Sequence, residues 1–295
     1  MSEDAGDGLT VAAPAKINLY LHVTGRRDDG YHLLDSLIAF AGVGDGVRVQ
    51  RADDLSLAVV GPNAAAVPSG ADNLVLAAAR ALARAAGVEA GAAITLDKHL
   101  PAGAGMGGGS ADAAATLRAL ARLWNIGADD VDLSVLAAGL GADVPMCLAG
   151  RAAFASGIGE VLTPAPALPA VALVLVNPGE ALATPAVFAA RSGPFGAAAR
   201  FDKAPADAAE LASILAERDN DLTAAATSLV PAVGDVLAAL DATAGCLLAR
   251  MTGSGATGFG LFADVDTAEA TARDIAAVNP TWWCQATTLE KRASW

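Results

Sequence analysis

The sequence has little cysteine and few aromatic residues. Its three cysteines, Cys147, Cys246 and Cys284, are widely spaced and form no CxxC pair, so they indicate neither a disulfide framework nor a zinc site. A reducing cytoplasm fits this usage. Aromatic residues make up only 4% of the 295 residues and apolar residues 54%, many of them alanine. We therefore expect closely packed helices and a core of alanine, leucine and valine.

Positive charge is also scarce. Lysine and arginine number 19 against 32 aspartates and glutamates, a formal net charge of −13, which argues against a nucleic-acid or anionic-membrane binder. Any phosphate site must therefore be built locally from a few cations and backbone N–H groups. The acidic start lacks the basic-then-apolar order of a signal peptide, and no uninterrupted apolar run could span a bilayer. We expect a soluble cytoplasmic protein.

Segments typical of strands and of helices alternate along the chain and predict an α+β fold of two lobes. The Pro-rich stretch Thr163–Ala170 is the candidate boundary, which divides the chain into residues 1–165 and 166–295. Residues 192–207 show no periodicity and predict a mobile surface loop. Short strands are expected within 9–60 and at AAITLDKHL, VALVLVNPG, CLLARM, GFGLFA and WWCQATTL, and helices at 73–86, 110–124, 130–140, 207–217, 222–228, 230–242 and 266–277.

A glycine-rich loop, PAGAGMGGGSADAAA from Pro101 to Ala115, joins a predicted strand to a predicted helix. Without Cβ atoms the backbone can approach a polyphosphate closely, and the free N–H groups and dipole of the helix start attract anions. The loop is neither a Walker A motif, because it lacks GK[ST], nor a Rossmann GxGxxG. A mere turn is the ordinary alternative, but this position favours phosphate binding.

Three further motifs stand at separate places in the chain. Lys16, in PAKINLYLHVTGRRDDGYH, is the only lysine before Lys98; a lone lysine is usually a solvated charge, but here it enters an apolar strand. Asp143, in GLGADVPMCLAG, follows a predicted helix and precedes a proline, where a capping or turn aspartate is the ordinary interpretation. Met251–Phe262 holds a second glycine loop, which alone indicates a tight turn.

Together, in this order and spacing, the four motifs resemble the GHMP kinases over nearly the whole chain. PAKINLYLHVTGRRDDGYHLLDS is similar to the branch whose substrate is a cytidine diphosphate-linked methylerythritol of the non-mevalonate isoprenoid pathway. The resemblance implies an ATP-dependent kinase, monomeric or homodimeric, that uses ATP and Mg²⁺. It also implies a ribosomal protein S5 domain 2-like N-terminal lobe, a ferredoxin-like C-terminal lobe, and a substrate cleft between them.

The resemblance also implies roles for individual residues. Lys16 and Asp143 are the catalytic pair: an aspartate can accept the hydroxyl proton, a step worth about 10²–10⁴ in rate, and a lysine beside it stabilises developing charge. Tyr31 and His32 would contact the cytidine by stacking and by hydrogen bonding to the ring edge, with Phe188 on the opposite face. Asn18 and Thr184 are further candidate substrate contacts. The candidate ATP contacts are Pro101, Ala102, Gly103, Ala104, Gly105, Met106, Gly107, Gly108, Gly109, Ser110 and Ala111, with Lys98 and Asn73 for the ribose, phosphate or base.

The glycine loop departs from the family pattern, in which two serines are common. Gly108 and Gly109 precede Ser110, and Ala111 follows it, so Ser110 is the hydroxyl near the phosphates and the magnesium ligands stay unassigned. Magnesium would then be held mainly by ATP and water. Two other functions stay open. One is a kinase for homoserine or mevalonate, in which GRRDDGYH would have no base to contact, and the other is a silent nucleotide-binding module, against which Lys16 and Asp143 argue.

Overall fold

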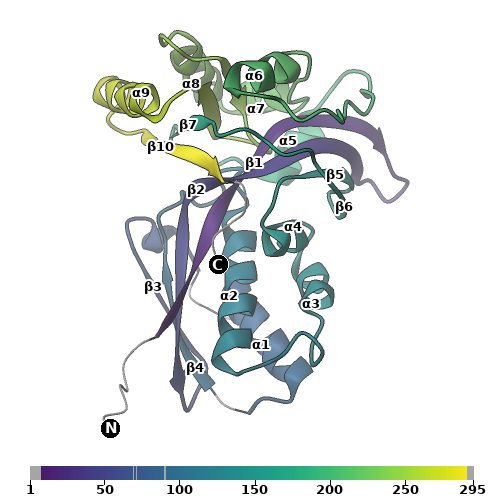
Figure 1. Ribbon diagram of the computed structural model, residues 1–295, viewed down its shortest axis with the longest axis vertical. Helices are drawn as coiled ribbons and strands as arrows, with labels where there is room; N and C mark the ends of the chain where they lie inside the picture. The colour runs from purple at the N-terminus through teal and green to yellow at the C-terminus, as the bar shows by residue number, and fades with distance from the viewer. Residues whose placement is uncertain (1–7, 69, 71, 90, 291–295) are drawn as a thin grey trace.

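The computed structural model describes residues 8–68, 70, 72–89 and 91–290, and in these residues ten strands form one sheet (Figure 1). The strand order is β3-β4-β2-β10-β7-β9-β8, with β1 and β5 paired to β2, and β6 to β5. The strands are β1 (Leu9–Arg26), β2 (His32–Ala52), β3 (Ser56–Val60), β4 (Gly91–Asp97), β5 (Ala153–Gly157), β6 (Val161–Pro164), β7 (Ala172–Asn177), β8 (Leu248–Met251), β9 (Gly258–Phe262) and β10 (Trp283–Glu290). The helices are α1 (Leu74–Ala86), α2 (Gly108–Leu123), α3 (Leu133–Leu140), α4 (Val144–Ala149), α5 (Thr184–Ala190), α6 (Ala208–Ala216), α7 (Thr223–Leu229), α8 (Ala232–Asp241) and α9 (Val265–Val278), with a 3-10 turn at Ala64–Ala66.

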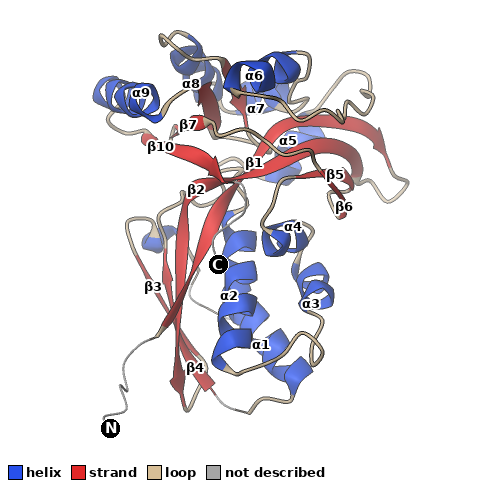
Figure 2. Cartoon of the chain, in the orientation of Figure 1, coloured by secondary structure: helices blue, strands red, loops and turns tan. Residues whose placement is uncertain are grey.

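The first two strands are longer than predicted. Instead of several short runs, β1 and β2 form one antiparallel hairpin paired from Leu9↔Val49 to Arg26↔His32. Register shifts, the first between Pro14 and Lys16, let β1 continue past the proline and bend. The hairpin runs from the lower half of the molecule into the upper half (Figure 2). Residues on β1 therefore lie where the two halves meet.

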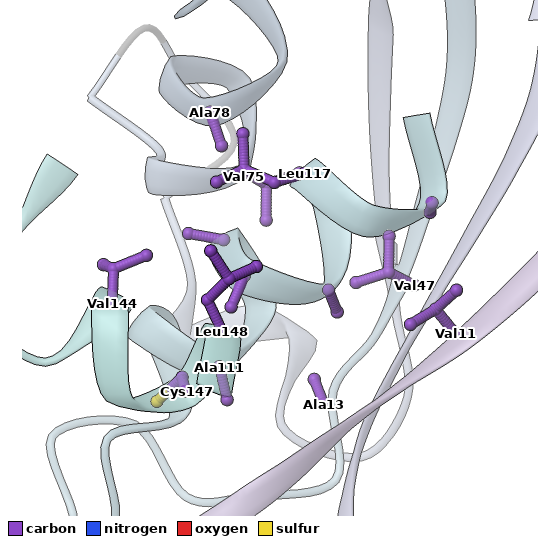
Figure 3. Close-up of a cluster of buried hydrophobic side chains, with 14 of the residues drawn as sticks. Val11, Ala13, Val47, Val75, Ala78, Ala111, Leu117, Val144, Cys147 and Leu148 are labelled. Atoms are coloured by element: carbon purple, nitrogen blue, oxygen red, sulfur yellow. The ribbon is translucent and has the colours of Figure 1, made fainter. Parts of the chain in front are cut away.

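In the lower half, α2 packs against the face of the long strands, α1 packs against α2, and α3 and α4 pack beside them (Figure 1). The α2 helix is rich in alanine, and Ala111, Ala113, Ala114 and Ala115 are fully buried, so its backbone lies close to both α1 and the sheet. Side chains from β1, β2, α1, α2 and α4 interdigitate in this core (Figure 3). This packing fixes the N-terminus of α2, which follows the glycine loop.

One hydrophobic core extends across the lower and upper halves of the molecule. β10 pairs with β7 along most of its length and with β2 through Leu289↔Ala41, which makes the sheet continuous. One hydrophobic cluster combines Ile17 and Leu19 of β1 with Leu173 of β7 and Phe259 of β9. The predicted boundary falls in the irregular link between β6 and β7. The division at residue 165 stays a prediction, because packing crosses it.

Four elements were missed by the sequence analysis: β5, β6, α4 and α5. Each has only four to seven residues, too few for periodicity to show, and both helices carry a proline in their first turn. Residues 192–207 are irregular, as predicted, but they are anchored: Gly196 N–H donates to the Val23 carbonyl, and Arg200 Nε donates to buried Asp35 at 2.8 Å. Among the described residues no helix is long and apolar enough to cross a membrane.

Candidate active site

A cavity of about 1170 Å³ opens where the β1–β2 hairpin, the glycine loop, the start of α4 and the start of α5 meet. Both β1 residues singled out from the sequence, Lys16 and Asn18, line it, together with Asp143 at the start of α4. Its wall also includes Gly103, Ala104, Gly105, Gly107, Gly108, Gly109, Ser110, Tyr31, His32, Thr184 and Phe188. The four sequence motifs therefore border one space.

Lys16 and Asp143 form an ion pair in this cavity, with Nζ and Oδ2 3.4 Å apart. Asp143 occupies the N-cap position of α4, but its carboxylate accepts no capping hydrogen bond, so it is free to face Lys16 and the cavity. The Lys16 side chain is 7% exposed, and its ammonium also donates to Asn18 Oδ1 at 2.9 Å. Asn18 in turn donates to Ser36 Oγ at 2.8 Å, which fixes the amide. The lysine is held in place on one side and is open to a ligand on the other.

The glycine loop is held against the second glycine loop, residues 251–257, by direct backbone contact. A Cβ on Gly105 would lie 2.6 Å from the Gly255 carbonyl oxygen, and one on Gly253 would lie 2.4 Å from the Gly105 carbonyl oxygen. Thr257 Oγ1 donates to the Ala104 carbonyl at 2.7 Å. The second loop therefore sets the position of the first, within which α2 begins at Gly108. The free N–H groups of that helix start border the cavity.

At the other end of the cavity, aromatic rings from separate segments meet. The His32 ring stacks on Phe188 of α5 with centroids 5.1 Å apart and planes 25° apart, and Phe195 packs edge-on against it with ring centroids 6.5 Å apart. Burial, followed by the nearby Arg26 and Arg191, lowers the pKa of His32. Tyr31 also lines the cavity and is 61% exposed. A flat ring could be bound here by stacking, and neutral His32 could hydrogen-bond to its edge.

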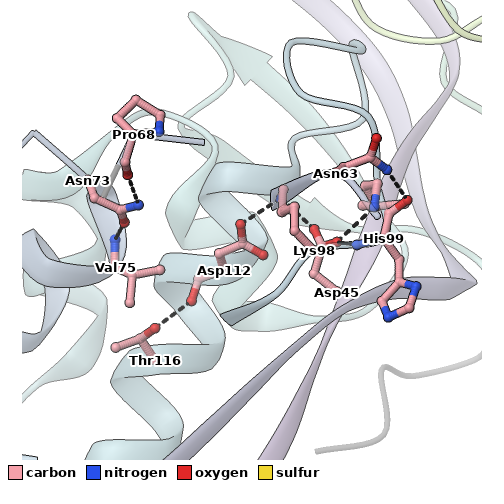
Figure 4. Close-up of polar contacts among 10 residues, drawn as sticks. Asp45, Asn63, Pro68, Asn73, Val75, Lys98, His99, Asp112 and Thr116 are labelled. Atoms are coloured by element: carbon pink, nitrogen blue, oxygen red, sulfur yellow. Dashed lines mark hydrogen bonds and ion pairs between the residues drawn. The ribbon is translucent and has the colours of Figure 1, made fainter. Parts of the chain in front are cut away.

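A smaller cavity of about 220 Å³ adjoins the glycine loop and is lined by Pro68, Val75, Leu96 and Lys98. Lys98 Nζ donates to Asp45 Oδ2 at 2.5 Å and to Asp112 Oδ2 at 2.7 Å (Figure 4). One lysine cannot neutralise two buried carboxylates fully. Burial and then Asp45 raise the pKa of Asp112 to about 7 against the opposing effect of Lys98. Asp112 Oδ1 has no hydrogen-bond partner among the described residues.

Comparison with known proteins decides the family. A model of the GHMP kinases N terminal domain matches residues 73–151, and one of the GHMP kinases C terminal region matches residues 197–281. The chain is 56% identical over 275 residues to a 4-diphosphocytidyl-2-C-methyl-D-erythritol kinase of Paramagnetospirillum magneticum, covering 93% of this chain and 96% of the relative. The chain belongs to the GHMP kinase family. It is an ATP-dependent small-molecule kinase, as the four motifs predicted.

Other GHMP kinases agree with this assignment. A kinase with the same name from Rhodospirillum rubrum is 52% identical over 285 residues, covering 97% of this chain and 94% of the relative. A crystal structure of 4-(cytidine 5'-diphospho)-2C-methyl-D-erythritol kinase superposes with a TM-score of 0.79 at 38% identity, covering 95% of this chain and 99% of the other. Homoserine kinase from Cytophaga hutchinsonii superposes with a TM-score of 0.73 at 19% identity, covering 100% and 98%, and shares the fold. The predicted two-domain α+β GHMP kinase fold is confirmed.

Not every candidate residue presents its side chain to the large cavity of this GHMP kinase. Met106 and Ala111 point into the core; the Met106 carbonyl accepts from Lys16 N–H at 2.9 Å. Pro101 and Ala102 line the smaller cavity instead, as do Lys98 and Asn73. The Asn73 amide caps α1: Oδ1 accepts from Val75 N–H at 2.8 Å, and Nδ2 donates to the Pro68 carbonyl at 2.6 Å (Figure 4). Contacts of these residues with a nucleotide stay predictions.

The sequence analysis missed two arginines on the large cavity, Arg26 and Arg191. It also missed Asp45, which orders the chain before the glycine loop by accepting from His99 N–H at 2.6 Å and Leu100 N–H at 2.8 Å. Arg26 lies within the GRRDDGYH segment, which the sequence analysis assigned to substrate binding, so its position on the cavity could have been predicted. The positions of Arg191 and Asp45 could not have been predicted, because neither residue lies in one of the four motifs.

Proposed function

We propose that this chain transfers the γ-phosphoryl group of ATP to the 2-hydroxyl of 4-diphosphocytidyl-2-C-methyl-D-erythritol, giving the 2-phosphate and ADP. The observation that carries the proposal is one cavity holding the Lys16–Asp143 pair, the glycine loop and the His32–Phe188 stack. Relatives 50–56% identical over most of the chain bear this enzyme's name. The reaction belongs to isoprenoid precursor synthesis, and cytoplasmic location and a monomeric or homodimeric state are part of the same proposal.

The Lys16–Asp143 pair would perform the proton transfer. Asp143 accepts the proton of the attacking hydroxyl, because its carboxylate lies in the cavity without a capping bond. Lys16, whose ammonium lies 3.4 Å from that carboxylate, stabilises negative charge as it develops on the transferring group. Asn18 and Thr184 would position the substrate. The Thr184 hydroxyl lies 2.8 Å from Ser254 Oγ, so its orientation is set by the second glycine loop.

The glycine loop and the start of α2 would bind the phosphates of ATP. Backbone N–H groups at Gly108, Gly109 and Ser110 belong to the first turn of α2, where they have no intrahelical acceptor. Ser110 is the hydroxyl of this turn on the cavity wall. Hard oxygen ligands suit Mg²⁺, which keeps several waters and binds substrate phosphates. Ser110, with ATP and water, fits Mg²⁺, which would neutralise phosphate charge.

The aromatic end of the cavity would select the cytidine. Tyr31 and Phe188 would stack on the two faces of the base, and His32, kept neutral by its lowered pKa, would hydrogen-bond to the ring edge. The smaller cavity would hold part of the ATP nucleoside. Lys98 and Asn73 would shape that cavity, because their polar groups are already engaged within the protein.

An ADP-release assay tests the proposal. Wild-type protein with Mg-ATP should turn over 4-diphosphocytidyl-2-C-methyl-D-erythritol but neither homoserine nor mevalonate. Asp143→Asn should lower kcat by about 10²–10⁴ while ATP still binds. Asp132→Asn is the matched control, because Asp132 is an exposed helix N-cap that accepts from Ser134 N–H. Use of another substrate, or full activity in Asp143→Asn, would refute the proposal.

A further inference from the structure

Two arginines flank the aromatic end of the large cavity, and the mechanism above does not use them. Arg26 ends β1, and Arg191 directly follows α5, one turn after Phe188. Both line the cavity, and both lie near enough to His32 to lower its pKa, after the effect of burial. The two guanidinium groups therefore reach the same end of the cavity from segments far apart in the sequence.

Arg191 is held in a fixed orientation. Its Nη1 donates to the Gly193 carbonyl at 3.2 Å, its Nη2 donates to the Pro194 carbonyl, and its guanidinium carbon lies 5.0 Å from the centre of the Phe195 ring. Its Nε–H has no acceptor among the described residues. A guanidinium fixed by two carbonyls and an aromatic ring loses little freedom when it binds a ligand. The other N–H groups of Arg191 make no hydrogen bond to the described residues.

Among the described residues, neither arginine forms an ion pair. Within the described ranges, Arg27 pairs with Asp29 at 2.7 Å and Arg200 with Asp35 at 2.8 Å. Arg26 instead donates Nε–H to the Gly30 carbonyl at 3.2 Å and forms no ion pair there. Asp29 also lines the cavity, but Arg27 occupies its carboxylate. In a chain of net charge −13, two uncompensated guanidinium groups at one cavity end indicate a site for an anion.

We propose that Arg26 and Arg191 together bind the diphosphate of the nucleotide-linked substrate and so select a nucleoside diphosphate over a nucleoside. The proposal rests on the proposed function, because it takes the substrate to carry a diphosphate between the stacked base and the reacting hydroxyl. Guanidinium groups match phosphate oxygens in geometry and charge. The glycine loop binds the phosphates of ATP, and the arginines bind those of the other substrate. Neither arginine touches the reacting hydroxyl, so both lower KM without taking part in the chemical step.

The test compares the binding of CDP and of cytidine, with the ATP site filled by a non-hydrolysable ATP analogue. Arg191→Gln and Arg26→Gln should each lower the preference for CDP over cytidine by about tenfold or more, with cytidine affinity unchanged. Each should raise KM for the diphosphate substrate while kcat and KM for ATP stay within about twofold of wild type. Arg273→Gln is the control, because Arg273 is an exposed arginine on α9.

The outcomes separate the possible roles of these residues. If CDP affinity is unchanged in both variants, or cytidine binding weakens as much as CDP binding, the diphosphate assignment is wrong. Arg191→Lys keeps the positive charge but loses the planar, bidentate guanidinium group, so it should retain part of the preference for CDP over cytidine. If Arg191→Gln does not fold, Arg191→Lys and Arg26→Gln decide. Wild-type turnover is measured separately: its absence refutes the proposed function, whereas an unchanged CDP preference in an active enzyme refutes only the arginine site.

Discussion

The contact between the two glycine loops predicts different effects for the same substitution at Gly103 and Gly105. Both glycines have a left-handed backbone, but their surroundings differ. Gly105 has φ +75°, and a Cβ there would lie 2.6 Å from the Gly255 carbonyl oxygen and 2.7 Å from that of Thr252. Gly103 has φ +65°, and a Cβ there would have nothing within 4 Å. Alanine at either position bears the left-handed backbone cost, but only at Gly105 does it also clash.

The magnitudes follow from these two terms. A left-handed conformation costs a residue with a Cβ about 1–2 kcal/mol. The reduced freedom of the unfolded chain returns about 0.4–1 kcal/mol to both variants. The net loss expected for Gly103→Ala is therefore about 1 kcal/mol. Forcing a methyl group against backbone atoms adds about 1–3 kcal/mol, so Gly105→Ala should lose about 2–4 kcal/mol.

The assay is denaturant unfolding of both variants without nucleotide, followed by KM for ATP. Gly105→Ala should unfold at clearly lower denaturant than Gly103→Ala, and its KM for ATP should rise, because the displaced loop no longer aims its N–H groups at the phosphates. Unfolding in the absence of ligand avoids any collision between a Cβ at Gly103 and ATP. Equal destabilisation of the two variants would show that the loops do not interlock as described.

Three further predictions rest on other contacts. The pKa of Asp112 is raised from 3.8 to about 7 in the native protein. Between these pH values the native state therefore binds a proton that the unfolded state has lost. As a result, the contribution of this carboxyl group to the free energy of unfolding falls as pH rises through 7. The unfolding free energy of wild type minus that of Asp112→Asn should therefore decrease from pH 5 to pH 8, and a constant difference would contradict the assignment. Tyr31→Ala and Phe188→Ala should each weaken substrate binding by about 1–3 kcal/mol if the rings stack on the base, measured by calorimetry, and unchanged affinity in both would exclude stacking. Asp35→Asn removes the carboxylate that holds residues 192–207, so trypsin should cut that segment faster, whereas cleavage at the wild-type rate would show that the segment is held elsewhere.

Local features of the fold could be predicted because they depend on neighbouring residues. A helix was predicted at 73–86, and α1 runs from Leu74 to Ala86, with the Asn73 amide capping its start and Gly87 ending it in a left-handed conformation. The partners of Lys98 could not be predicted in this way, and its contact with the nucleotide stays a prediction. Its ammonium donates to Asp45 and Asp112, two carboxylates that no local pattern connects to it.

The family, the glycine-rich segment at the start of α2 and the two residues predicted as the catalytic pair could be recognised from short motifs and their order along the chain. Folding brings Lys16 to within 3.4 Å of Asp143, places Gly105 against the second glycine loop, and brings Arg26 and Arg191 close to His32. The reason is physical. Backbone conformation and helix capping depend on residues a few positions apart, whereas these contacts join distant segments and are fixed by the bend of the β1–β2 hairpin and by packing across the continuous sheet.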